Sequence, residues 1–107
     1  MLLPYARLTD PASYVLPQIV RTPRLLLRSA TADDAAAVAQ ARGESYAELL
    51  PWFHQVMGKP DQEHDAQWQS ERLTQAAKAA QRRERLPYLA WASGTCIGAV
   101  DLIPVWR

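Results

Sequence analysis

The sequence has a single cysteine, Cys96, so no disulfide can form within the chain and no cluster of thiolates is available for a metal. No apolar run approaches the roughly 20 residues that a membrane-spanning helix needs. The amino terminus has two leucines followed by Pro4, with no basic run ahead of a long apolar segment, which is not the pattern of a secretory signal. These absences favour a cytoplasmic protein whose fold depends on neither disulfides nor bound metal.

The chain also lacks a large excess of charge of either sign. Twelve Lys and Arg residues face eleven Asp and Glu residues, which leaves a formal net charge of +1. Such a balance excludes attraction to nucleic acid or to an anionic membrane by bulk charge. We therefore expect neither nucleic acid nor membrane among the partners.

Glycine is scarce and scattered. The four glycines occur singly, at positions 43, 58, 94 and 98, so no glycine-rich phosphate-binding loop can be identified. The serines lie in no nucleophile-elbow context, and a hydrolase triad has no support. A nucleotide site or an acyl-enzyme mechanism within this chain is not expected.

The two histidines, His54 and His64, lack the i, i+4 spacing or thiolate partners that fix a zinc site. With the acidic residues between them they are better explained as solvated polar groups at the entrance of a helix, and we expect no metal. Cys96 lies at the start of an apolar run, where a buried small hydrophobic residue is more plausible than a nucleophile.

What remains is the composition of one globular domain: 107 residues, 49% hydrophobic and 21% charged. Prolines at positions 4, 11 and 17 predict an extended lead-in over residues 1–19. The folded domain is expected over residues 20–107.

The first half of that domain reads as a strand followed by two helices. A short run of leucines between arginines predicts a strand over residues 24–28. Thr31 is a candidate N-cap for an alanine-rich helix that we expect to end at Gly43 in a left-handed cap. A second short helix should stop before Pro51, because the residue before proline disfavours the helical conformation.

The second half reads as a long helix and a hairpin. Residues 61–85 contain no glycine or proline and predict one helix, with acidic residues at its start, arginines at its end and Leu73 on its core face. Strands over residues 88–93 and 96–103 should form a hairpin with a type II′ turn at Gly94-Thr95. The expected fold is α+β: an antiparallel three-stranded sheet in chain order, packed with helices.

Between the short and the long helix lies a segment rich in large side chains, Trp52, Phe53 and His54. Aromatic residues beside a helix end can fill the core or line a substrate site. The sequence leaves both interpretations open.

The order of these elements, read with the actual residues, resembles the amino-terminal half of the GNAT superfamily of N-acetyltransferases, in its RimJ/RimL-like branch. The resemblance covers about residues 20–106 and rests on Thr22-Pro23-Arg24-Leu25-Leu26-Leu27-Arg28, on Thr31 to Asp34, on Leu50-Pro51-Trp52 and on Cys96-Ile97-Gly98-Ala99-Val100-Asp101-Leu102. It implies acetyl-CoA as cosubstrate and an amine, a protein amino terminus or a small amine, as acceptor.

The resemblance also assigns roles. It places Trp52, Phe53 and His54 in the wall of the acceptor site, whereas the family's pyrophosphate-binding loop and its acid and base have no matching position within these 107 residues. No catalytic or cofactor-binding residue can therefore be transferred. We expect a truncated domain that is inactive alone.

A second hypothesis, from a different class, is a non-catalytic α+β interaction module. Both hypotheses direct attention to the strand over residues 96–103, whose apolar side chains, together with Val105 and Trp106, would face water on an edge carrying little charge. We expect self-association, or capture of a complementing chain, through this edge.

Overall fold

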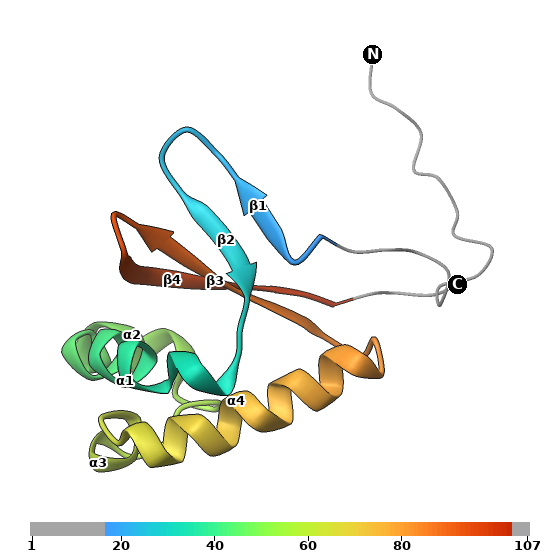
Figure 1. Ribbon diagram of the computed structural model, residues 1–107. Coiled ribbons are helices and arrows are strands. Elements are labelled where there is room, and N and C mark those ends of the chain that lie inside the picture. The colour runs from blue at the N-terminus through green and yellow to red at the C-terminus, as the bar shows by residue number, and fades with distance from the viewer. Residues whose placement is uncertain (1–16, 104–107) are drawn as a thin grey trace.

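A computed structural model describes residues 17–103 of the chain (Figure 1). In chain order the elements are β1 (Ile19–Arg21), β2 (Leu26–Ser29), the 3-10 turn η2 (Ala32–Asp34), α1 (Ala35–Glu44), α2 (Tyr46–Phe53), α3 (Pro60–Glu63), α4 (Ala66–Gln81), β3 (Leu86–Ala92) and β4 (Thr95–Leu102). The α+β class is as expected. Most of the predicted lead-in lies outside the described residues.

The sheet has four strands in the order β1-β2-β3-β4, all antiparallel, so the predicted three-stranded sheet is wrong by one strand. The three predicted strands are adjacent in the predicted order, and β1 is added beside β2, with Ile19 opposite Arg28. A three-residue strand is too short to show the alternation by which strands are recognised in a sequence. Its turn is closed by Thr22, whose hydroxyl oxygen accepts a hydrogen bond from the Leu25 N–H at 2.9 Å.

The β3–β4 hairpin turns one residue earlier than predicted. Ala92 pairs with Thr95, and the two turn residues are Ser93 and Gly94, with φ of 49° and 80°. Two successive positive φ values define a type I′ turn rather than type II′. The I′ turn needs a residue that tolerates the left-handed region at both positions, and glycine satisfies the second one.

Helices cover one face of the sheet, with α1 and α4 packed beneath the strands (Figure 1). The core lies in this interface and consists of small and aliphatic side chains: Ala30, Ala35, Val38, Leu73, Leu89 and Cys96. The interpretation of Cys96 as a buried small hydrophobic residue is confirmed, and burial raises the pKa of its thiol. None of the helices within residues 17–103 is long and apolar enough to cross a membrane.

An ion pair ties the sheet to the helical layer. Both terminal nitrogens of the Arg28 guanidinium donate to the buried Asp34 carboxylate, at 2.8 and 2.7 Å. The same carboxylate accepts from the Thr31 N–H at 3.0 Å. Thr31 is the N-cap of η2, and the N-cap of the alanine-rich α1 is Asp34, not Thr31 as predicted. Burial raises the pKa of Asp34, but the bonds from Arg28 and Thr31 outweigh it and hold that pKa below its ordinary value.

The ends of the first two helices differ from the prediction. Gly43 does not end α1 in a left-handed cap; it lies inside the helix, where a side chain would collide with the ring of His64. Pro51 does not stop α2, which continues to Phe53. Pro51 removes one helical hydrogen bond to Ala47, and this is tolerated because α2 buries no residue and water can reach the carbonyl.

The predicted helix over residues 61–85 is two helices. It breaks between Glu63 and Ala66, and α4 begins afresh with Asp65 as N-cap, whose carboxylate accepts from the Gln67 N–H at 3.0 Å. No glycine or proline marks the break. Its cause is tertiary, because the break turns Glu63 into the interior.

Truncation of Leu73 tests the packing of α4. Leu73 is buried in the core cluster, so Leu73→Ala should lower the free energy of unfolding by about 2–5 kcal/mol, through lost burial and the cavity left behind. Thermal or urea denaturation measures this. The exposed Gln75→Ala on the same helix is the control, and equal stability of the two variants would show that this face of α4 does not pack in the core.

Candidate functional site

The three aromatic and imidazole side chains implicated by sequence lie at the carboxyl-terminal end of α2. Trp52 and Phe53 are its last residues and His54 follows in the turn; Trp52 is 81% exposed and Phe53 51%. The interpretation that they fill the core is therefore wrong. All three residues are exposed; we call Trp52, Phe53 and His54 the aromatic wall, and its role in binding an acceptor stays a prediction.

The structure does not join the two histidines. His54 belongs to the aromatic wall, whereas the ring of His64 packs against Gly43 of α1. Within residues 17–103, no three His, Cys, Asp or Glu side chains gather in a way that could hold a metal ion.

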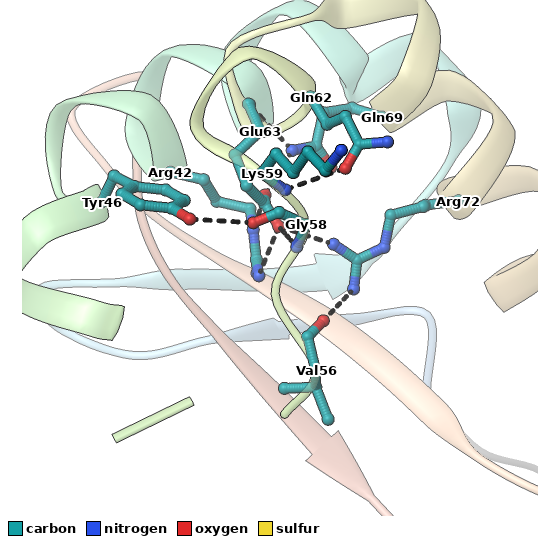
Figure 2. A network of polar contacts seen from close by, with 9 residues as sticks. All are labelled: Arg42, Tyr46, Val56, Gly58, Lys59, Gln62, Glu63, Gln69 and Arg72. Atoms are coloured by element: carbon teal, nitrogen blue, oxygen red, sulfur yellow. Dashed lines mark hydrogen bonds and ion pairs between the residues drawn. The ribbon is translucent and has the colours of Figure 1, made fainter. Parts of the chain in front are cut away.

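The segment that follows the aromatic wall is held by side chains from the helices (Figure 2). Arg72 of α4 donates to the Val56 carbonyl at 3.3 Å, and the Tyr46 hydroxyl of α2 donates to the Gly58 carbonyl at 3.0 Å. The Gly58 N–H in turn donates to the Glu63 carboxylate at 2.9 Å. Backbone groups that a loop usually leaves to water are thus bonded to the scaffold, which fixes the path of the chain beyond the wall.

Glu63 is the centre of this network and is fully buried. Its carboxylate accepts from Arg42 Nε of α1 at 2.7 Å, and from Arg72 Nη1 and Gln69 Nε2 of α4 at 3.0 and 2.8 Å. Gln69 also donates to the Glu63 backbone carbonyl at 2.9 Å. One carboxylate therefore connects α1, α3, α4 and the loop behind the aromatic wall (Figure 2).

The electrostatics follow from these contacts. Burial raises the pKa of Glu63, but the bonds from Arg42, the Gly58 N–H and Gln69 outweigh it and hold that pKa below its ordinary value. The pKa of Arg72 is lowered by burial and by the nearby charge of Arg42. Glu63 stays ionised and its oxygens are occupied, so it serves as an anchor rather than as a proton acceptor.

Sequence reasoning missed this anchor, because it placed Glu63 among solvated acidic residues at a helix start. The one signal near Glu63 in the sequence is the glycine at position 58. A side chain there would collide with the ring of Trp68. The Arg72 guanidinium stands over that ring, 4.7 Å from its centroid. Arginine, aromatic ring and glycine come together only in the folded chain.

The fourth strand presents an open edge. Among residues 17–103, β4 pairs on one side only, with β3. Large apolar side chains on and just after it are exposed: Ile97 by 56%, Leu102 by 47% and Ile103 by 68%. Asp101 is the charged residue on this strand, and it faces Arg85 at 3.4 Å. Val105 and Trp106, predicted to extend this edge, lie outside the described residues.

Neutralising Glu63 tests the anchor. Glu63→Gln keeps the shape but leaves Arg42 and Arg72 without their counter-ion, and we expect a loss of about 3 kcal/mol in the free energy of unfolding. Denaturant titration measures it. Glu71→Gln, an exposed change of the same kind on α4, should stay within about 0.5 kcal/mol of the parent; equal losses would contradict the role given to Glu63.

Stability should also fall in acid, because the fold depends on the ionised Glu63 carboxylate. The pKa values of Glu63 and Asp34 are depressed in the folded state. Both carboxylates therefore stabilise the fold fully above their unfolded-state pKa values, about 4, and this stabilisation is lost as the pH falls through the folded-state values. The midpoint of thermal unfolding should drop steeply below about pH 4. Glu63→Gln should flatten that drop, and an unchanged slope would remove Glu63 from the explanation.

No family model and no curated protein matches the sequence. Among solved structures, the ribosomal-protein-S5-alanine acetyltransferase of Vibrio fischeri matches with a TM-score of 0.69 at 15% sequence identity, over 83% of this chain and 48% of that one. The chain thus spans about half the length of the structure it matches. At this identity the likeness shows the fold alone: the matched part of this chain shares its fold with about half of that acetyltransferase structure.

Proposed function

We propose that this chain supplies the acceptor-side half of an acetyl-CoA-dependent N-acetyltransferase of the RimJ/RimL-like kind. The observation that carries the proposal is the fold match over 83% of the chain to a protein named as an alanine acetyltransferase. The segments 22–28, 31–34 and 96–102, on which the resemblance rests, contain most of β2, the turn η2 and most of β4, and they support the proposal.

In this function the aromatic wall contacts the acceptor amine. Its exposed apolar surface, followed by a loop bonded to the Glu63 network, offers a rigid contact for an amino terminus or a small amine. The reaction of the resembled family is attack of the amine nitrogen on the thioester carbonyl: a C–N bond forms, the C–S bond breaks, and a base takes the amine proton.

The described residues do not fit the pyrophosphate of acetyl-CoA. Such a group needs backbone N–H groups at a glycine-rich helix start. Here Gly43 lies inside α1, Gly58 lies against Trp68, Gly94 forms the hairpin turn and Gly98 is within β4. Cofactor-holding and catalytic residues would come from outside residues 17–103, and no metal is required. We also propose a cytoplasmic location, because a chain with a single cysteine has no internal disulfide to form.

Calorimetry with acetyl-CoA tests whether the cofactor-binding residues lie outside this chain's described part. The 107-residue polypeptide should show no dissociation constant in the micromolar range, because the anion-binding loop is not supplied by the described residues. A micromolar value for the monomer would contradict the proposal.

Expression of these codons with any adjoining coding sequence tests the activity itself. The longer product should release CoA from acetyl-CoA when an amine is added. Trp52→Ala should raise the KM for the amine several-fold and leave acetyl-CoA binding unchanged, whereas Val56→Ala, an exposed apolar change beyond the wall, should do neither. Absence of transfer by the longer product would overturn the proposal.

One observation favours a second candidate function, a non-catalytic interaction module. The open edge of β4 carries exposed Ile97, Leu102 and Ile103, and an unpaired apolar edge is a template for another strand. Under either function we propose that this edge pairs with a second copy or with a complementing chain.

Sedimentation tests the edge. The parent polypeptide should associate at high micromolar concentration, and Leu102→Lys should weaken assembly about tenfold or more by placing a charge in the seam. Gln75→Lys, with the same added charge on the exposed side of α4, should assemble like the parent. A parent that stays monomeric would rule out self-association.

A further inference from the structure

The face of the sheet that points away from the helices carries no charged side chain. Leu89 of β3 lies in the core with residues of α1 and α4, so its neighbours Tyr88 and Ala90 point to the opposite face. Residues paired across strands share a face. The pairing therefore places on it Val20, Leu27, Ser29, Leu86, Tyr88, Ala90, Gly98, Val100 and Leu102. We call this set the outer sheet face.

The middle of the outer sheet face is buried, although the described helices lie on the other side of the sheet (Figure 1). Tyr88 and Ala90 are each 7% exposed, whereas Val100 and Leu102 on β4 are 44% and 47% exposed. A sheet with two apolar faces needs a cover on each of them. None of the helices within residues 17–103 supplies the second cover.

The described part of the chain begins beside this face. The Tyr88 hydroxyl donates to the Pro17 carbonyl at 2.7 Å, and the Ser29 N–H donates to the Gln18 carbonyl at 2.9 Å. Tyr88 and Ser29 both belong to the outer sheet face, so Pro17 is held next to it. The three residues that precede Pro17 can reach at most about 10 Å from it.

The segment that precedes Pro17 matches the outer sheet face in composition and in length. Ten of residues 1–16 are hydrophobic, and Arg7 and Asp10 are the charged ones. Three large apolar residues, Tyr14, Val15 and Leu16, come directly before Pro17. Sixteen residues span up to about 50 Å when extended, whereas the distance from β1 to β4 is three strand spacings, about 15 Å.

We propose that the outer sheet face binds residues 1–16 of its own chain, with Tyr14, Val15 and Leu16 as the first contacts. Contact between two uncharged apolar surfaces removes both from water and buries no unpaired charge. A second copy fits less well, because it competes with a segment tethered at Pro17, whose effective concentration is of the order of millimolar. The inference does not rest on the acetyl-transfer function.

Nuclear Overhauser spectra of the whole polypeptide, labelled with ¹³C and ¹⁵N, test the proposal. We expect cross-peaks from the side chains of Tyr14, Val15 or Leu16 to the methyl groups of Leu27 or Val100. In a mixture of labelled and unlabelled polypeptide, isotope-filtered spectra should lack these cross-peaks, because the contact lies within one chain. Absence of the cross-peaks from the first sample, or cross-peaks between copies only, would overturn the proposal.

Charged substitutions test the contact through stability. Val15→Asp combined with Leu16→Asp places charge against the uncharged face. We expect the melting temperature to fall by at least about 5 °C, and the fluorescence of a dye that binds exposed apolar surface to rise at least about twofold. Gln55→Asp with Val56→Asp, the control, adds adjacent acidic residues at exposed positions and should do neither. An unchanged melting temperature and dye signal in the first variant would reject the contact.

Discussion

The buried carboxylate of Glu63 is the contact on which the arrangement of the helices depends. Two arginines, a glutamine and a backbone N–H converge on it from α1, α4 and the loop ahead of α3. Burying an ion is costly unless every lone pair is met, and here the charge and the hydrogen bonds are met together. The helices and the loop therefore have one relative placement that avoids an unpaired charge, and the break between α3 and α4 follows from it.

A second ion pair does the same for the sheet. Arg28 leaves β2 on the helix side, binds Asp34 at the start of the helical layer and covers the ring of Trp91 on β3. A strand, a helix start and a neighbouring strand are thus joined through one guanidinium. The small and aliphatic side chains of the core, Ala30, Ala35, Val38, Leu73, Leu89 and Cys96, allow close approach of the layers but do little to fix their relative orientation. The carboxylates of Glu63 and Asp34 fix the relative orientation of the helices and the sheet.

Two exposed apolar features lie on the described part of the molecule. The aromatic wall lies at the end of α2, and β4 leaves an apolar edge that pairs on one side only within residues 17–103. The fold match covers 48% of an acetyltransferase structure, and only the aromatic wall enters the acetyl-transfer proposal.

The sequence by itself determined the α+β class, the chain order of β2, β3 and β4, the burial of Leu73 and Cys96, and the start of the helical layer at Thr31, because hydrophobic period and capping chemistry are local. It also determined the resemblance whose fold the comparison supports. Tertiary structure decided the strand β1, the passage of α2 through Pro51, the break ahead of α4 and the exposure of Trp52. The strand β1 forms because it pairs with β2, and α2 passes through Pro51 because solvent reaches it. Glu63 is held by Arg42, 21 residues away in the chain, which no local pattern can reveal.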